Sequence, residues 1–275
     1  MGTETAGRTV HSAGRTVHSA AFFDLDNTLV QGASLFHLAR GLTAHGMVTK
    51  REIAGHALRQ VRFRVFGEQS GLLDDVQEHA LDFVKGHEVA RMEKICEAVF
   101  DDYLADKIWP GTRALSEAHL LNGKEVWLVT AAPIELAQVI ARQLGLTGAL
   151  ATQPEAVQGV YTGRISGPLL HGPDKARQVA RLARERGLDL AHSYAYSDSA
   201  NDLPLLSLVG HPVAVNPDRA LRRHARHHDW AIVDYRTTRR ARPGLPVAGA
   251  AAAVGAVAAG AAAAAAAVHW AGDRD

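Results

Sequence analysis

Residues 21–30 read AFFDLDNTLV, and this stretch decides the fold. Three apolar residues run directly into Asp24 and Asp26, as happens where a buried parallel strand ends at an edge that carries a site. Side chains two apart on an extended segment point the same way, so we expect both carboxylates to face the crevice above that edge. Carboxylates this close repel each other unless a cation lies between them or one holds a proton. The stretch therefore indicates a chemical site.

The composition is that of a globular protein with a sizeable core. The chain has 275 residues, of which 47% are hydrophobic and 21% charged, enough for one large or two modest domains. Its formal net charge of +1 provides no overall field that would attract nucleic acid. No GxxxxGK[ST] or GxGxxG motif follows an expected strand, so nucleotide binding of those kinds has no support. The single cysteine, Cys96, cannot form an internal disulfide and fits a buried core position.

The first 20 residues contain the same eight letters twice, AGRTVHSA at 6–13 and again at 13–20. They lack the apolar middle region of a secretory signal peptide. We therefore expect residues 1–20 to be a disordered leader or an over-long start, to which no function is assigned.

Residues 34–106 have the periodicity of helices. Apolar positions share helix faces in two stretches, namely Leu35, Leu38, Ala39 and Leu42, and later Leu72, Val76, Ala80 and Val84. Thr49 and Glu52 form a capping box that starts a new helix. We expect a helical cap inserted after the first strand, where a lid or substrate-reading domain would lie. Three arginines of the insertion could bind an anionic substrate or lie on a solvated face: Arg59, Arg62 and Arg64.

After residue 107, expected strands alternate with expected helices, which predicts an α/β fold with a Rossmann-like, doubly wound parallel sheet. Strands are expected at 125–129, 193–197, 212–215 and 230–234. Helices are expected after residue 110, from Pro133, from Asp174, near Asn201 and over 218–228, with a β-hairpin over 157–166. The core would consist of residues 21–33 and 107–235.

Residues 236–275 form a basic and then Ala-rich tail. Residues 247–268 are uncharged Ala, Gly and Val, long enough to span a bilayer but only weakly apolar. Arginines precede this run, so an anchored protein would keep its body in the cytoplasm. Three interpretations stay open: a C-terminal membrane anchor on a cytoplasmic protein, a peripheral or oligomerising helix, and a low-complexity tail.

Polar residues stand at the expected strand ends and helix starts. They are Asp24 and Asp26, Thr130, Lys175, and Asp198 with Asn201 and Asp202. The C-terminal ends of parallel strands lie along one edge, so these residues can converge. Acids, a hydroxyl and an ammonium together suit a dianionic phosphoryl group beside a hard cation. Individually, several have plainer readings as helix caps, or, for the lysine, as a solvated helix residue.

The ordered set DLDNT, the strand ending in Thr130, the helical Lys175 and SDSANDLPLL from Ser197 resembles the haloacid dehalogenase (HAD) superfamily of phosphatases. The helical insertion directly after the first motif is similar to the phosphoserine phosphatase-like branch, subfamily IB. The resemblance covers roughly residues 21–235 and rests on four motifs in order. It implies a HAD-like core with a cap and a phosphoric monoester hydrolase.

The resemblance also implies roles for single residues. Asp24 would attack phosphorus and form an aspartyl-phosphate. Asp26 would protonate the leaving alkoxide and then deprotonate the attacking water, while its main-chain carbonyl reaches the metal. Thr130 would hydrogen-bond a phosphoryl oxygen, and Lys175 would neutralise the charge of the equatorial oxygens.

The implied cofactor is Mg²⁺, which prefers octahedral oxygen ligands. It would be held by Asp24, Asp198 and the Asp26 carbonyl together with a phosphate oxygen and waters. Asn201 and Asp202 would support the metal site and position Lys175.

The motifs depart from the serine-specific relatives at the substrate-reading positions. The glutamate that pairs with the substrate's amine in those relatives is replaced here by Ala33, and Ala131 and Ala132 replace two glycines. We therefore expect another small phosphomonoester as substrate. The alternatives are phosphoserine, a membrane-bound phosphate such as a lipid headgroup, and a catalytically idle scaffold. No oligomeric state is predicted.

Overall fold

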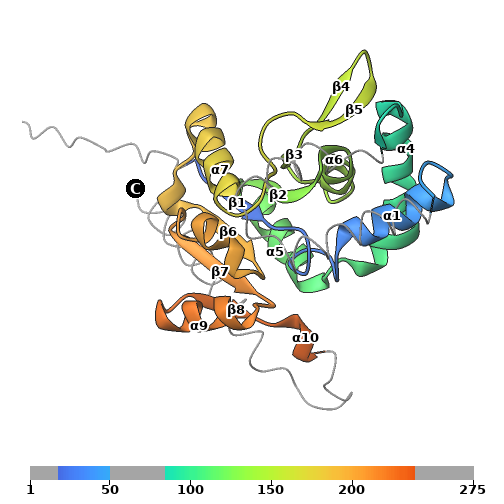
Figure 1. Ribbon diagram of the computed structural model, residues 1–275. Coiled ribbons are helices and arrows are strands. Elements are labelled where there is room, and N and C mark those ends of the chain that lie inside the picture. The colour runs from blue at the N-terminus through green and yellow to red at the C-terminus, as the bar shows by residue number, and fades with distance from the viewer. Residues whose placement is uncertain (1–17, 50–83, 239–275) are drawn as a thin grey trace, which may run out of the picture.

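The computed structural model describes residues 18–49 and 84–238. Its centre is a six-stranded sheet in the order β3-β2-β1-β6-β7-β8, and all paired strands of this sheet are parallel (Figure 1). The strands are β1 Ala20–Phe23, β2 Glu125–Pro133, β3 Gly148–Thr152, β6 Tyr194–Ser197, β7 His211–Val215 and β8 Ala231–Val233. The expected doubly wound α/β fold is confirmed.

Strand β1 is one of the two middle strands of the sheet. All four of its residues are buried, as expected for a strand covered on both faces. From β1 the chain adds β2 and β3 on one side and later β6, β7 and β8 on the other. The sheet therefore reverses its strand order between β1 and β6. Open α/β sheets bind ligands at such a topological switch point, beyond the carboxyl ends of the strands.

Helices cover both faces of the sheet. Leu115 of α5 (Pro110–Leu121) packs with Phe23, whereas Phe22 packs against helices on the opposite face. That opposite face carries α7 (Pro173–Arg186), α8 (Leu203–Leu206) and α9 (Arg219–His227). Helix α7 begins with Pro173 and ends at Gly187, whose φ of 65° is the left-handed conformation that glycine adopts without strain. The short helices are η4 Leu190–His192, η5 Ala200–Asp202 and α10 Tyr235–Thr238.

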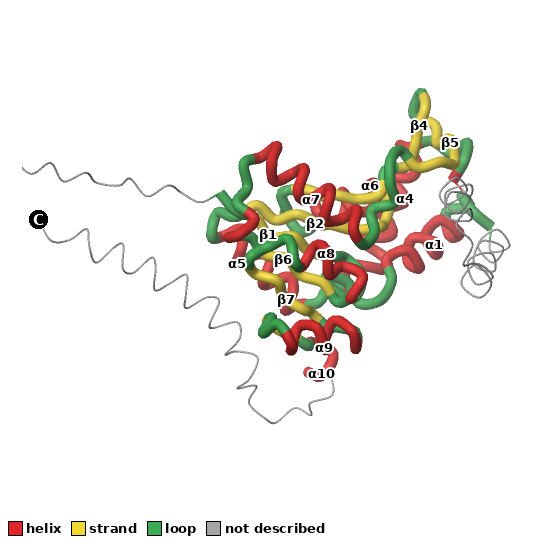
Figure 2. The backbone as a smooth tube through the Cα atoms, turned by 60° about the vertical axis from the view of Figure 1, so that its left-hand side comes forward, coloured by secondary structure: helices red, strands yellow, loops and turns green. Residues whose placement is uncertain are grey.

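The described part of the cap consists of α1 (Ser34–Ala44), α4 (Val89–Val99), the π-turn η2 (Phe100–Leu104) and the 3₁₀ turn η3 (Ala105–Lys107). Its two connections to the core pair with each other, because Val30 and Ile108 form an antiparallel bridge. The hairpin of β4 (Pro154–Val157) and β5 (Val160–Ile165) lies beside α4 (Figure 2).

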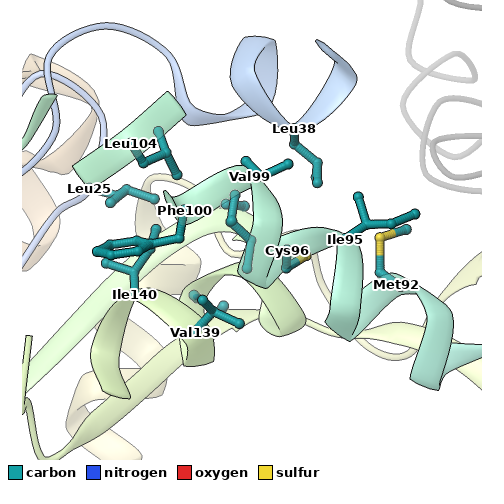
Figure 3. Packing of buried hydrophobic residues seen from close by; sticks show 14 of the residues in the cluster. Leu25, Leu38, Met92, Ile95, Cys96, Val99, Phe100, Leu104, Val139 and Ile140 are labelled. Carbon is teal, nitrogen blue, oxygen red and sulfur yellow. The ribbon is translucent and has the colours of Figure 1, made fainter. Parts of the chain in front are cut away.

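The cap shares a hydrophobic cluster with the core. In Figure 3, cap residues such as Val99 and Phe100 point toward Val139 and Ile140 of α6 (Ile134–Gln143). Cys96 is part of this cluster and is fully buried, as expected. Burial also raises the pKa of its thiol, so it is an inert core residue.

Several sequence-based boundaries were wrong. Strand β3, residues 148–152, was not expected, and β2 continues past residue 129 to Pro133, which is the N-cap of α6 and not its first residue. The hairpin begins at Pro154 rather than 157. The leader was expected to end at residue 20, but Ala20 opens β1 and Ser19 is buried.

The core also continues past the expected boundary at residue 235. Arg236 in α10 donates hydrogen bonds to Asp234 and to the Pro217 carbonyl, and the Tyr235 ring stacks on Trp109. These contacts attach α10 to the sheet, so the core continues to Thr238.

Within residues 18–49 and 84–238, we find no helical segment with the length and hydropathy that a membrane crossing requires. The Ala-rich run at 247–268 lies outside the described residues, as do Glu52 of the expected capping box and the three arginines of the insertion. The membrane anchor remains one of three open interpretations.

A buried histidine of α5, His119, makes the stability of the fold depend on pH. Burial, assisted by Lys124 and His211, lowers the pKa of His119 to about 4, and its Nε2 is 2.7 Å from the Tyr196 hydroxyl. The unfolded chain holds the proton up to about pH 6.5. Stability from this group is therefore complete above about pH 6.5 and is lost as the pH falls toward 4, by about 3 kcal/mol.

We expect His119→Gln to reduce this loss, as measured by urea unfolding between pH 4.5 and 7.5. The difference between variant and wild type isolates the histidine from other titrating groups. His45→Gln, at an exposed position, is the control and should keep the wild-type profile. Identical pH profiles for wild type and His119→Gln would contradict the assignment.

Candidate active site

The site lies at the switch point, where β1 and β6 end side by side. The Asp24 amide donates to the Tyr196 carbonyl at 2.9 Å, which extends the pairing of the two strands by one residue. This bond fixes the backbone of Asp24 directly at the edge of the sheet. Asp198 follows the last residue of β6, so both carboxylates begin from the same pair of neighbouring strands.

Lys175 joins two of the carboxylates. Its Nζ lies 2.5 Å from Asp24 Oδ1 and 2.8 Å from Asp202 Oδ2. The three side chains are between 3% and 9% exposed, so this is a buried ion-pair triad. The first turn of α7 positions the lysine, as expected, although the helix begins at Pro173 and not at Asp174. Burial opposes the charged ammonium, but the two carboxylates outweigh it and raise the pKa of Lys175, which keeps the lysine protonated.

Asp202 positions the lysine, with help from a serine that sequence reasoning missed. Ser197 Oγ donates to Asp202 Oδ2 at 2.7 Å, on the oxygen that also accepts from Lys175. The expected supporting role of Asp202 therefore has a geometric basis. The side chain of Asn201 is exposed, and the two hydrogen bonds of the lysine ammonium go to aspartates, so the expected role of Asn201 stays a prediction.

The carboxylates at this edge carry more negative charge than the lysine balances. Burial raises the pKa of Asp24 to about 6, against the opposing effect of Lys175. Burial also raises the pKa of Asp198 to about 7, and the charges of Asp24 and Asp202 add to this effect. A carboxylate pair with raised pKa values is stabilised in its ionised form by a cation placed between its members.

This donor set fits a hard divalent cation. Two carboxylates and a main-chain oxygen match the oxygen ligands that Mg²⁺ prefers, with further positions left to water and substrate. Within the described residues, no three or more His, Cys, Asp and Glu side chains group so as to hold a metal. The magnesium site expected from the sequence has fewer side-chain ligands than such a group, because only Asp24 and Asp198 would contribute side chains.

Asp26 lies against the cap. Its Oδ1 accepts a hydrogen bond from the Ser34 amide at 2.8 Å, in the first turn of α1. The N-cap residue of that helix, Ala33, offers no side-chain acceptor, so Asp26 satisfies one of the free amides of the helix start. The proposed acid and the first helix of the cap are thus in direct contact.

Thr130 stands near the end of β2, the strand paired with β1 on the other side. It is 2% exposed, and its hydroxyl accepts from the Ala132 amide at 3.1 Å. The hydroxyl proton remains for another acceptor, such as a phosphoryl oxygen. The pairing of β2 with β3 shifts register just after this residue, between Thr130 and Pro133.

Two asparagines to which the sequence analysis gave no role stabilise the loop after β1. Asn27 has a φ of 57°, a conformation that asparagine tolerates, and its Oδ1 accepts from the Gly32 amide at 3.1 Å. Its side chain also lies near the Asp198 carboxylate and opposes the rise in the pKa of that group. Buried Asn216 donates from Nδ2 to the Asn27 carbonyl at 2.9 Å. A signal existed in NPD at 216–218, a turn sequence directly after a strand.

The chain belongs to the haloacid dehalogenase-like hydrolases, whose family model matches residues 21–207. The expected family and the hydrolase class are thereby confirmed.

Among its relatives is the Mycobacterium tuberculosis protein named phosphoserine phosphatase SerB1, which is 50% identical over 83% of this chain and 75% of that protein. A structure from Bordetella pertussis, of unknown function, is 30% identical with a TM-score of 0.72, covering 80% of this chain and 99% of that one. A substrate-bound phosphoserine phosphatase complex matches at 17% identity with a TM-score of 0.53, covering 82% of this chain and 97% of that one. The last likeness concerns the fold alone.

Proposed function

We propose that this protein is a Mg²⁺-dependent phosphatase that hydrolyses a small phosphomonoester through an aspartyl-phosphate on Asp24. The observation that carries the proposal is the buried triad of Asp24, Lys175 and Asp202 at the switch point, with Asp198 beside it. A buried nucleophile held by a protonated lysine suits attack on an anionic phosphoryl group, because the ammonium attracts the substrate and fixes the carboxylate.

The steps follow from the atoms available. Lys175 holds Oδ1 of Asp24, which leaves Oδ2 to attack phosphorus. As that bond forms, the bond from phosphorus to the ester oxygen breaks, and Asp26 gives its proton to the leaving alkoxide. A water molecule then attacks phosphorus while Asp26 takes a proton from it, and the bond from phosphorus to Asp24 breaks. Inorganic phosphate leaves, and Asp24 is an ionised carboxylate again.

The other residues hold charge and position. Lys175 and the Thr130 hydroxyl would contact phosphoryl oxygens, and Asp202 with Ser197 keeps the lysine in place. Mg²⁺, held by Asp24, Asp198 and the Asp26 carbonyl, would supply positive charge that keeps both carboxylates ionised and balances the phosphoryl charge. The contact of Asp26 with Ser34 brings the acid to the side of the site where the cap lies.

Phosphoserine is the second candidate substrate. In its favour, the relative named phosphoserine phosphatase SerB1 is 50% identical over most of the chain. Against it stands Ala33, which is exposed at the start of α1 and cannot pair with an ammonium group. Among the described cap residues, His37 interacts electrostatically with Asp26. Burial, Arg40 and Lys107 lower the pKa of His37. These cations repel an ammonium group but attract a second anionic group, which phosphoserine also has in its carboxylate, so they argue against its amine alone.

Anchoring of the enzyme, and with it action on a lipid-headgroup phosphate, would depend on residues 247–268. No described residue bears on it. The proposed acid, Asp26, contacts the cap directly, and a site beside a cap suits a substrate small enough to be enclosed. A small diffusible phosphomonoester is therefore the first choice, with the protein in the cytoplasm.

Hydrolysis of p-nitrophenyl phosphate is expected to require Mg²⁺. Removal of the metal with EDTA should abolish turnover, and added Mg²⁺ should restore it. In Asp198→Asn, the concentration of Mg²⁺ that gives half-maximal activity should rise by at least about tenfold, because a charged ligand becomes neutral. Asp189→Asn, at the N-cap of η4 with a 42% exposed side chain, is the control. Turnover that EDTA does not affect would overturn the metal-dependent mechanism.

The substrate class is decided with the same assay and a panel of phosphomonoesters. The proposal places esters that lack an amine above phosphoserine in kcat/KM. A kcat/KM for phosphoserine well above that of every other ester would make the second candidate correct.

A further inference from the structure

The loop that carries Asp198 is held from outside by Asp218, to which the mechanism above assigns no role. The Asp218 amide donates to the Asp198 carbonyl at 2.8 Å. In the opposite direction, the Ala200 amide donates to Asp218 Oδ2 at 2.9 Å. The two bonds fix the loop at both ends of a three-residue segment, the segment that positions the Asp198 carboxylate.

Asp218 is also the N-cap of α9. Its Oδ1 accepts from the Leu221 amide at 2.7 Å, and its carbonyl accepts from the Arg222 amide. The two carboxylate oxygens thus have separate tasks: one completes the start of a helix, and the other holds a loop of the site. A residue needed only as a cap would require a single side-chain oxygen.

The residues before Asp218 contact the loop after β1, which carries Asp24 and Asp26. Asn216 has a φ of 48° and is buried, its Nδ2 donates to the Asn27 carbonyl, and its Oδ1 accepts from the Tyr235 amide. The turn after β7 therefore contacts the loop after β1 through Asn216 and the loop after β6 through Asp218. These are the two loops that carry Asp24, Asp26 and Asp198.

We propose that Asp218 is a positioning residue that sets the affinity of the site for its divalent cation by holding the Asp198 loop in place. This inference rests on the proposed function, since the cation is part of it. Loops near the surface otherwise sample several conformations, and each conformation that moves Asp198 weakens a site that depends on a fixed set of oxygens. Residues that orient metal ligands typically change metal affinity by about 10- to 100-fold when they are replaced.

Three variants separate the two tasks of the side chain. Asp218→Ser keeps an oxygen that can cap α9 but cannot also reach the Ala200 amide, whereas Asp218→Ala loses both contacts. Asp189→Ser is the matched control, because Asp189 is likewise a capping aspartate with a largely accessible side chain, accepting from the Ala191 amide in η4. Asp218 is itself exposed, so its replacement leaves no cavity.

The measurement is the Mg²⁺ concentration that half-saturates the folded protein, called the Mg²⁺ midpoint, fitted from the rise of the melting temperature with Mg²⁺ concentration. The kcat at saturating Mg²⁺ is measured in parallel. Asp218→Ser and Asp218→Ala should both raise that concentration by about tenfold, with kcat at saturation close to wild type. Without metal, Asp218→Ala should melt about 2–4 °C below Asp218→Ser, because only the former loses the cap. Asp189→Ser should leave the Mg²⁺ midpoint unchanged.

Different results overturn different claims. Wild-type turnover that needs Mg²⁺, together with an Asp218→Ser midpoint within twofold of wild type, would overturn the role of Asp218 and leave the proposed function standing. An equal shift in Asp189→Ser would do the same, since the effect would then belong to any lost cap. A wild-type protein that Mg²⁺ does not stabilise, and whose hydrolysis does not need it, would overturn both.

Discussion

Asp24→Asn is expected to lower the turnover of p-nitrophenyl phosphate by about 10⁴-fold or more, the largest effect of any single substitution here. An amide is a far weaker nucleophile than a carboxylate and cannot form the aspartyl-phosphate. The substitution is nearly isosteric, and the amide oxygen of the new side chain could still accept from Lys175. Since burial disfavours the ionised Asp24, the variant should fold at least as stably as the wild type without metal.

The test is steady-state hydrolysis at saturating Mg²⁺ together with trapping of the phosphoenzyme after a rapid acid quench. Asp174→Asn is the control, because Asp174 also lies in the first turn of α7 but pairs with Arg177. It should retain full activity and form the phosphoenzyme. If Asp24→Asn turned over like the wild type, the nucleophile would be another residue and the proposed mechanism would fail.

Lys175→Met should affect both stability and catalysis. The methionine fills similar space but leaves Asp24 and Asp202 buried without their cation, which costs about 3–5 kcal/mol when one partner of a buried ion pair is removed. Turnover should fall by about 10²- to 10³-fold, the usual effect of removing one group that stabilises the transition-state charge. Urea unfolding of the metal-free protein and hydrolysis at saturating Mg²⁺ measure the two effects.

Two further variants identify the cause. Arg177→Met, two residues along α7 at an exposed position, should change the free energy of unfolding by less than about 0.5 kcal/mol. Asp202→Asn combined with Lys175→Met should recover part of the lost stability, because it removes one of the two stranded charges. It should not recover turnover. A Lys175→Met protein as stable as the wild type would show that the triad contributes little to the fold.

The strand and helix pattern of the core could be predicted because its signals are strong and local. Buried apolar runs end in polar residues at β1 and β6, and α7 has a proline at its start and a glycine at its end. Strand β3 gave no such signal. Its sequence GALAT is made of small residues without alternation, and Gly148 lies against the ring of Trp127, so that only a side chain distant in sequence completes it.

The acids and the lysine of the site were predictable, whereas Ser197 and Asp218, which support them, were not. Asp24, Lys175 and Asp202 fall at ends of elements that a parallel sheet must bring to one edge, and the structure does place them in contact. Ser197 and Asp218 act through hydrogen bonds to other parts of the site. Such bonds depend on side-chain direction and loop conformation, which residue spacing does not reveal.

The hydrophobic cluster that the cap shares with the sheet has a consequence for how this enzyme can diversify. Leu38 and Val99 of the insertion pack in one interior with Leu128 and Ile140 of the core, and the two connecting strands pair at Val30 and Ile108. Exchanging the whole insertion for that of a relative would strip the sheet of its own packing on one side. A change of specificity in this protein should therefore be easier to obtain by point substitution in the insertion than by exchange of the whole insertion.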